Sequence, residues 1–234
     1  MRLLDTLRSR LKSRAALPPE LEDRLQALTE KAPPPTRNRH RRSRYVTVDV
    51  ETTGLDMHRD RLLSIGAVSV DRGRIDLGGC FEIVLKQDAS STTDNILVHR
   101  IGGQRQLGGV EPAEALIRFL EYVAHAPLVA YRAEFDRTVL DRTLREVLGT
   151  QTMSRWIDLA ELLPALYPGN DNKTMDDWLR AMNITMIELH DALADALATA
   201  QMLQICLPLA DALNMTCPQH LIEMQKAQHW LGKR

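Results

Sequence analysis

The sequence predicts an α/β domain, and two changes of hydrophobic period along the chain support this fold class. Between residues 45 and 85, β-branched and aliphatic side chains recur in short runs separated by polar turns, which is typical of antiparallel strands. From residue 111 the apolar side chains recur at helical spacing, and short apolar runs at 127–131 and 153–157 separate the helices. We therefore expect five strands, the first three in an antiparallel meander, with helices packed on them.

The first strand, at residues 45–51, ends in a Thr-Thr-Gly break and carries two acids. Because strand side chains alternate, Asp49 and Glu51 share one face and lie roughly 6.5–7 Å apart along the backbone. Two carboxylates can converge on one divalent cation such as Mg²⁺, which prefers oxygen ligands, but such a half-site needs further acids from elsewhere. Taken alone, the two acids could equally face water on a half-buried strand.

Composition limits the class of protein. The 234 residues are 44% hydrophobic and 26% charged, which is enough for one good core. No apolar run approaches the roughly 20 residues of a membrane-spanning helix, and the N-terminus lacks the apolar core of a secretory signal, so we expect a cytoplasmic protein with no membrane span. The three cysteines are widely spaced, which indicates buried, reduced thiols in place of disulfides or a zinc site.

Charge is distributed unevenly along the chain. Residues 1–44 contain 12 Lys and Arg against 5 Asp and Glu, a net charge of +7, which leaves −8 for residues 45–234. An acidic body argues against a wide basic groove for long duplexes, whereas a basic extension can supply non-specific affinity for phosphates. Residues 1–14 fit a basic amphipathic helix that could be solvated, contact nucleic acid or a protein, lie on a membrane surface or act in organelle targeting.

The remaining elements follow from the same patterns. Residues 17–32 contain a second, weaker helix before a run of three prolines. Gly149 is a suitable helix stop, and Thr174 is a suitable N-cap. The other strands and helices are expected at 62–70, 75–85, 127–131 and 153–157, and at 111–123, 134–148, 158–166 and 174–182.

A late stretch, residues 189–203, carries a histidine and two more acids. If one helix covered all of it, His190 and Asp195 would diverge by about 140° on the helix surface. We therefore expect His190 to precede the helix, with Asp191 as the N-cap and Asp195 one turn inside it. In this arrangement Asp195 can point toward the acids of the first strand while His190 approaches from the loop.

Three motifs occur in order at the first strand, at a mid-domain helix start and at a late helix start: DVETTG at 49–54, AEFD at 133–136, and a His190-x4-Asp195 pair. Together they resemble the DEDDh exonucleases, the DnaQ-like family that includes the proofreading subunits of bacterial replicative polymerases. The resemblance implies a ribonuclease-H-like fold with a mixed five-stranded sheet. It divides the chain into a basic extension at 1–44, an exonuclease domain at 45–205 and a helical segment at 206–234.

The same resemblance implies a two-metal site for phosphodiester hydrolysis. Asp49, Glu51, Asp136 and Asp195 would be the ligands of two Mg²⁺ or Mn²⁺ ions, and His190 would be the general base.

Substrate contacts are also implied by the resemblance. The backbone at Thr52 and Thr53 would hold the terminal nucleotide, and Leu55 would pack on its base unless it belongs to the core. Relatives often have His-Asn or His-His where this chain has Tyr131-Arg132, so Arg132 is expected to contact the scissile phosphate in their place.

The expected function is 3′ to 5′ hydrolysis of single-stranded or frayed DNA ends in repair, proofreading or end trimming. RNA ends or short oligoribonucleotides are the alternative substrate, because nothing in the sequence reads the 2′-hydroxyl. A non-catalytic scaffold that binds nucleic acid or a polymerase is a further alternative, which the five intact catalytic positions disfavour. The expected partners are a nucleic acid with a 3′ end and, as a candidate protein, a DNA polymerase or repair factor.

Overall fold

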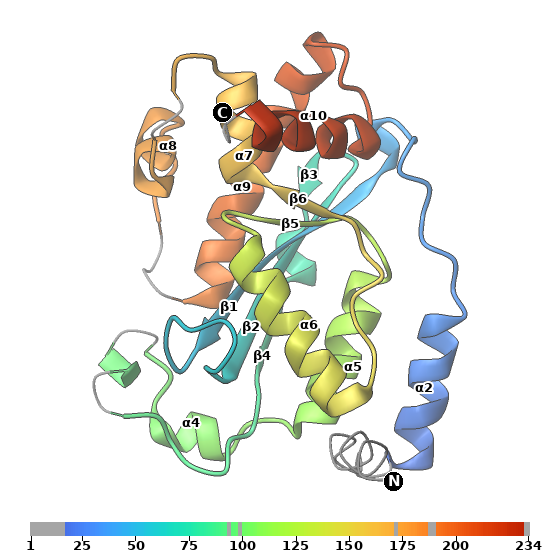
Figure 1. Ribbon diagram of the computed structural model, residues 1–234, viewed down its shortest axis with the longest axis vertical. Helices are drawn as coiled ribbons and strands as arrows, with labels where there is room; N and C mark the ends of the chain where they lie inside the picture. The colour runs from blue at the N-terminus through green and yellow to red at the C-terminus, as the bar shows by residue number, and fades with distance from the viewer. Residues whose placement is uncertain (1–16, 93–94, 98–99, 171–172, 187–190, 232–234) are drawn as a thin grey trace, which may run out of the picture.

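A six-stranded mixed β-sheet lies at the centre of the computed structural model, which describes residues 17–92, 95–97, 100–170, 173–186 and 191–231 (Figure 1). Its strands are β1 Arg44–Thr52, β2 Leu62–Asp71, β3 Arg74–Ile75, β4 Phe81–Val84, β5 Leu128–Ala130 and β6 Trp156–Asp158. The order is β3-β2-β1-β5-β6, and β4 also pairs with β2. β2 is antiparallel to β1, β3 and β4, whereas β5 is parallel to β1 and to β6. The predicted α/β class and mixed sheet are confirmed.

The single third strand predicted at residues 75–85 is wrong, because two separate strands take its place. β3 and β4 both pair with β2, and a 3-10 turn, η2 Leu77–Gly79, lies between them. The Asp76 side chain caps this turn by accepting a hydrogen bond of 3.1 Å from the Gly79 N–H. The chain therefore leaves the sheet at this point, and the described sheet has six strands instead of five.

Helices cover both faces of the sheet (Figure 1). α5 and α6 lie on one face, and α9 packs along β1 and β2 on the other. Their bounds, with those of the other helices, are α2 Pro19–Thr29, η1 His40–Arg42, α4 Gly103–Leu107, α5 Pro112–Val123, α6 Glu134–Leu148, α7 Leu159–Leu166, α8 Met175–Ala181, α9 Ala192–Ala212 and α10 Pro218–Leu231.

Three predicted helix-end residues are confirmed, whereas the helix expected at 17–32 is shorter and the helix expected from residue 158 begins at Leu159. Gly149 follows α6 with a left-handed φ of 68°. Thr174 caps α8 in a capping box with Asp177, and the Asp191 side chain caps α9.

β1 divides the hydrophobic core into two clusters, because its alternate side chains pack on opposite faces of the sheet. Val46, Val48 and Val50 belong to a cluster that also contains buried side chains of α5 and α6. Tyr45 lies in the second cluster with side chains of α7, α9 and α10. Thr47 faces the same side as Tyr45 and donates a hydrogen bond of 2.7 Å to the Ala196 carbonyl of α9. Asp49 and Glu51 lie on the same face of β1 as Tyr45 and Thr47.

The described part of the N-terminal extension packs on the body. Leu25 and Leu28 of α2 are buried in the core cluster of α5 and α6. Arg24 pairs with Glu114 at 2.7 Å and with Glu121 at 2.8 Å, both on α5. The predicted basic helix at residues 1–14 lies outside the described residues.

A buried histidine joins the extension to the start of β1 and to the segment after α9. His40 accepts a hydrogen bond at Nδ1 from the Tyr45 hydroxyl at 2.6 Å and donates from Nε2 to the Met215 carbonyl at 2.7 Å. Acceptance at Nδ1 requires the neutral ring, and burial lowers the pKa of His40, against the opposing effect of the bond to Met215.

Among the described residues, one helix meets the length and apolar composition of a membrane span, but it is a core helix and does not support a span. This helix is α9, with 21 residues. It packs along β1 and β2 and carries Asp195 in its first turn, which is the place of a core helix in this fold. Cys206 is buried in α9, Cys217 is buried before α10, and Cys80 is half-buried; all three are free thiols.

Candidate active site

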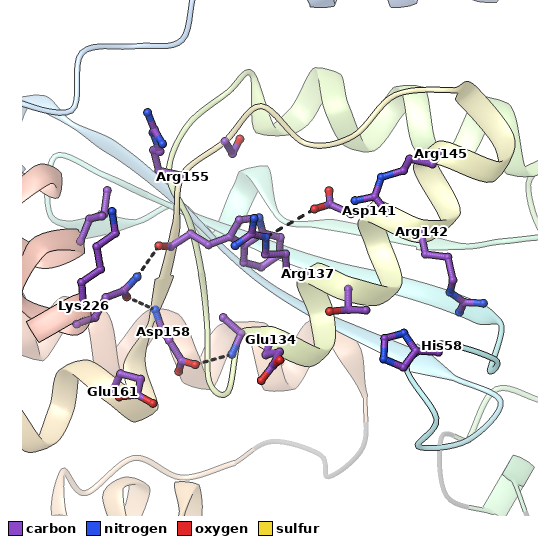
Figure 2. A pocket seen from close by; sticks show the side chains of 16 residues that line it. His58, Glu134, Arg137, Asp141, Arg142, Arg145, Arg155, Asp158, Glu161 and Lys226 are labelled. Atoms are coloured by element: carbon purple, nitrogen blue, oxygen red, sulfur yellow. Dashed lines mark hydrogen bonds and ion pairs between the residues drawn. The ribbon is translucent and has the colours of Figure 1, made fainter. Parts of the chain in front are cut away.

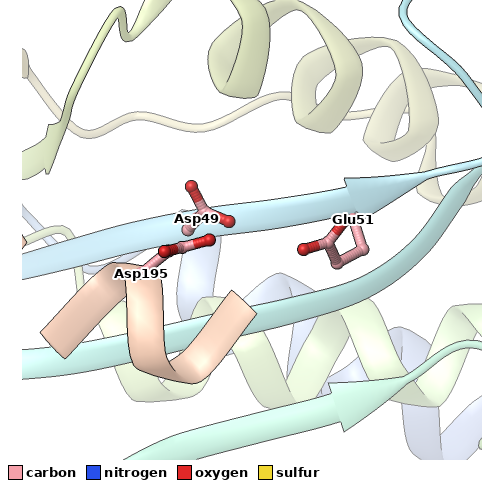
Figure 3. A group of neighbouring side chains, drawn as sticks. All are labelled: Asp49, Glu51 and Asp195. Carbon is pink, nitrogen blue, oxygen red and sulfur yellow. The ribbon is translucent and has the colours of Figure 1, made fainter. Parts of the chain in front are cut away.

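Two strand acids form the first half of the site. Asp49 and Glu51 lie near the carboxyl end of β1 on the face that α9 covers (Figure 3). β1 is the central strand, fixed by β2 along its whole length and by β5 on the other edge. A rigid strand therefore presents both carboxylates to the start of α9.

Asp195 completes a three-carboxylate cluster. The Asp191 carboxylate accepts a hydrogen bond of 2.9 Å from the Ala194 N–H, which fixes the start of α9 and places Asp195 in its first turn. One carboxylate oxygen from each of Asp49, Glu51 and Asp195 lies within 4.8 Å of the others. In Figure 3 these three side chains point toward one another from β1 and α9.

Close packing of α9 on the sheet depends on a glycine. Gly66 of β2 lies opposite Asp49 in the strand pairing. A Cβ atom at position 66 would lie 2.2–2.3 Å from backbone atoms of Ala192 and Leu193. The absence of a side chain at Gly66 therefore lets the start of α9, with Asp195, reach the strand acids.

Asp136 approaches the site from the opposite side of the sheet. β5 pairs with β1 only at Val46 and Thr47, so the edge of β1 is open beyond this point. Asp136, in the first turn of α6, accepts a hydrogen bond of 3.2 Å there from the Val50 N–H. Its carboxylate is buried beside the three-acid cluster, and it is one of the charges that raise the pKa of Asp49.

The acids repel one another and are poorly solvated. Burial, followed by the charges of Asp136, Asp195 and Glu51, raises the pKa of Asp49 well above its usual range. Burial raises the pKa of Glu51 to about 7, with Asp195 as the next cause. Burial also raises the pKa of Asp136 to about 8, against the opposing hydrogen bond from Val50. Four carboxylates gathered in this way offer oxygen donors alone, which suits hard cations such as Mg²⁺ or Mn²⁺.

The loop after β1 is held by its own hydrogen bonds. The Thr53 hydroxyl donates to Asp60 at 2.9 Å, and the Thr53 N–H donates to the Arg61 carbonyl at 3.0 Å. The Thr53 carbonyl accepts a hydrogen bond from the Asn95 side chain, so both backbone groups of Thr53 already have partners. Leu55 is 92% exposed, which excludes the core-packing role left open by the sequence.

Arg132 lies in a turn fixed by a residue that the sequence reasoning missed. The Asp158 carboxylate accepts hydrogen bonds of 2.9 Å from the backbone N–H groups of Arg132 and Ala133, and one of 2.8 Å from Ala160. The Arg132 side chain is exposed, and its backbone adopts a left-handed φ of 60°. The position of Asp158 between a predicted strand and a predicted helix was a capping signal that could have identified it.

His190 lies outside the described residues. Asp191, which follows it, is described as the cap of α9, as predicted. The structure thus brings Asp49, Glu51 and Asp195 together, places Asp136 beside them, and puts the loop with Leu55 at the end of the same strand.

The acid cluster lies within a region that matches a known family. The family model RNase_T, described as an exonuclease, matches residues 46–203. The chain belongs to the RNase_T exonuclease family. The matched region of this exonuclease domain runs from β1 into α9 and contains the four acids, which confirms the resemblance at the level of the family.

Curated relatives of the exonuclease domain include subunits of DNA polymerase III. The DNA polymerase III subunit epsilon of Escherichia coli (strain K12) is 29% identical over 170 residues, covering 68% of this chain and 69% of that protein. The DNA polymerase III PolC-type of Clostridium perfringens is 29% identical over 164 residues. That match covers 68% of this chain and 11% of the PolC-type protein, so the exonuclease domain matches a small part of that relative.

Solved structures share the fold of the exonuclease domain. E. coli exonuclease I in complex with a dT13 oligonucleotide has a TM-score of 0.59 at 21% identity, over 73% of this chain and 42% of that one. Exonuclease X in complex with 5′ overhanging duplex DNA has a TM-score of 0.58 at 18% identity, over 77% of this chain and 99% of that one.

Proposed function

We propose that this chain is a metal-dependent 3′ to 5′ exonuclease that removes nucleoside 5′-monophosphates from single-stranded or frayed DNA ends. The observation that carries the proposal is the convergence of Asp49, Glu51 and Asp195 within 4.8 Å, with Asp136 beside them. Mutual repulsion of these carboxylates is the expected state of a site built to bind cations. Family membership supports the reaction class.

Each acid has a role in this proposal. Asp49, Glu51 and Asp195 would bind the catalytic ions, Mg²⁺ or Mn²⁺, directly, and Asp136 would complete a site for two. Bound cations would lower the pKa of the attacking water and stabilise the leaving 3′ oxygen. His190 would take the proton of that water as general base.

The loop after β1 would hold the terminal nucleotide. Leu55 is exposed at the end of the strand that carries the acids, so it can pack on a base. Thr52 and Thr53 would position the nucleotide through a loop that Asp60 and Asn95 fix in place. Arg132, which is exposed at the start of α6, would contact the scissile phosphate.

DNA is the proposed substrate because the relatives include DNA polymerase III subunit epsilon and DNA polymerase III PolC-type, and the two fold neighbours were solved with DNA. The same relatives support a cytoplasmic role in replication or repair, with a DNA polymerase as candidate partner. RNA remains an outcome of the test, because no described contact is specific for deoxyribose.

Matched, 3′-end-defined substrates test the proposal. Purified protein with Mg²⁺ or Mn²⁺ should shorten 5′-labelled single-stranded DNA stepwise, act more slowly on blunt duplex DNA, and lose all activity in EDTA. Asp195→Asn should abolish hydrolysis, whereas Asp176→Asn, an exposed acid on α8, should leave it unchanged. Faster cleavage of matched RNA would change the substrate, and activity in Asp195→Asn equal to wild type would refute the assigned site.

A further inference from the structure

A large groove runs along the outer side of α6, on the helix that carries Asp136 (Figure 2). Its volume is about 830 Å³. α6 forms one wall, β6 and α10 form the opposite wall, and the loop after β1 closes one end through His58. We call it the α6 groove and define it by its basic side chains, Arg137, Arg142, Arg145, Arg155 and Lys226.

The accessible charges of the α6 groove are mainly positive, although residues 45–234 are net acidic. Arg137, Arg145, Arg155 and Lys226 are exposed. Among the acids, Asp141 is buried and accepts hydrogen bonds from the Thr152 N–H at 3.0 Å and hydroxyl at 2.8 Å. Asp141 also forms an ion pair of 3.7 Å with Arg137, whose side chain stays 61% exposed to the groove.

The other acids that line the α6 groove, Glu134, Asp158 and Glu161, lie at one end of it. Asp158 is occupied by three backbone N–H groups. Figure 2 shows Asp158, Glu134 and Glu161 together at one end of the groove, and Arg145 and Arg142 away from them.

The α6 groove is physically connected to the candidate active site. Arg142 donates a hydrogen bond to the Asp60 carbonyl and so ties α6 to the loop after β1. The Asp60 side chain in turn holds Thr53. Asp136 and Arg137 are neighbours on α6, one turned toward β1 and the other toward the groove. The loop that carries His58 thus links the end of β1, where two of the acids lie, to one end of the groove.

We propose that the α6 groove binds the phosphate backbone of the nucleic-acid strand whose 3′ end occupies the acid site. This rests on the proposed function and adds to it the path of the substrate. Arg137 and Arg145 are eight residues apart on one helix, roughly 12 Å, so they reach different phosphates. Guanidinium groups bind phosphate oxygens in pairs of parallel hydrogen bonds, which suits the three arginines that are exposed in the groove.

Binding without catalysis gives the test. Wild type and the triple variant Arg145→Ala/Arg155→Ala/Lys226→Ala would be titrated in EDTA with a fluorescent single-stranded 20-mer, at several salt concentrations. The variant should bind at least tenfold more weakly at low salt, and the slope of log affinity against log salt should fall by about 2, since each phosphate contact contributes about 0.7. The matched control, Arg74→Ala/Arg118→Ala/Arg180→Ala, removes the same charge from exposed positions outside the groove and outside the basic extension, and should bind like wild type.

Two further measurements distinguish a failure of the groove proposal from a failure of the proposed function. Hydrolysis of the p-nitrophenyl ester of thymidine 5′-monophosphate should be the same in all three proteins; a wild type that fails to cleave it counts against the proposed function, while the binding data still judge the groove. Unchanged affinity and salt slope in the groove variant would overturn the proposal, as would an equal loss in the control. Competition by poly-glutamate as effective as that by an oligonucleotide would also overturn it, in favour of an acidic protein partner.

Discussion

The Asp158 carboxylate accepts a hydrogen bond of 2.9 Å from the backbone N–H of Arg132, a residue held at a left-handed φ of 60°. A second bond from Ala133 and a third from Ala160 fix the end of β5, the start of α6 and the start of α7 to one side chain. Since α6 carries Asp136, this carboxylate positions part of the acid site without belonging to it.

Asp158→Ala should therefore destabilise the protein and slow hydrolysis. Loss of three hydrogen bonds to one partly buried carboxylate should lower the free energy of unfolding by about 2–4 kcal/mol. Urea denaturation measures the free energy of unfolding. Asp158→Asn keeps one acceptor oxygen, so its stability should fall between that of wild type and that of Asp158→Ala. Equal stability of wild type and Asp158→Ala would show that the turn is held by other contacts.

The metal-free protein should become less stable as the pH rises from about 4.5 to about 8. The pKa of Glu51 is raised from 4.5 to about 7 and that of Asp136 from 3.8 to about 8. Within this window the folded state holds protons that the unfolded state has released, so the free energy of unfolding falls with pH and levels off above pH 8. Urea denaturation in EDTA across this range measures the trend.

A variant separates this effect from His40, which acts in the opposite direction. Because His40 is buried in its neutral form, its contribution is lost as the pH falls below about 6.5. Glu51→Gln keeps His40 and should show a smaller loss of stability with rising pH than wild type. Added Mg²⁺ should reduce the loss in wild type as well, because a cation favours the ionised acids. Identical pH profiles for Glu51→Gln and wild type would contradict the assignment.

Gly66→Ala should impair the acid site from the neighbouring strand. A methyl group there would lie within 2.3 Å of the backbone at the start of α9 and push Asp195 away from Asp49. We expect the free energy of unfolding to fall by roughly 1–3 kcal/mol, measured by thermal unfolding. The rate of hydrolysis of single-stranded DNA should fall at least a hundredfold. Gly102→Ala is the control, because nothing lies within 4 Å of a Cβ atom at that position. Full activity in Gly66→Ala would mean that α9 can shift without moving Asp195.

His190→Ala should slow hydrolysis by about 10²–10⁴-fold without abolishing metal binding, the usual effect of removing a positioned acid–base group. The comparison is the dependence of rate on metal concentration in His190→Ala and in Asp195→Asn. A histidine variant restored by excess metal alone would identify His190 as a ligand or a structural residue.

Deletion of residues 1–44 should destabilise the protein, whereas deletion of residues 1–16 should not. Residues 17–44 supply Leu25 and Leu28 to the core and His40 to Tyr45, so their removal should cost about 3–6 kcal/mol. Deletion of residues 1–16 is thus the proper test of the basic segment as a nucleic-acid contact. In that variant the affinity for long strands should fall and the rate on the thymidine ester should stay constant. Equal thermal stability of both truncated proteins would contradict the packing described here.

By itself the sequence determined the local parts of the site. Strand alternation put Asp49 and Glu51 on one face of β1, and capping residues placed Asp191 before α9 and Asp195 inside its first turn. These features depend on φ and ψ preferences and on hydrogen bonds within a few residues, so a pattern along the chain is enough to predict them.

Tertiary structure alone decided how these parts meet. Residue spacing could not show that Gly66 lets α9 approach β1, that the short β5 leaves the Val50 N–H to Asp136, or that Asp158 holds the turn at Arg132. Nor could net charge reveal the α6 groove, because exposed arginines of α6 and Arg155, which precedes β6, are brought together while Asp141 is buried. These contacts join segments dozens of residues apart, and their energy depends on close packing and burial, which exist only once the chain has folded.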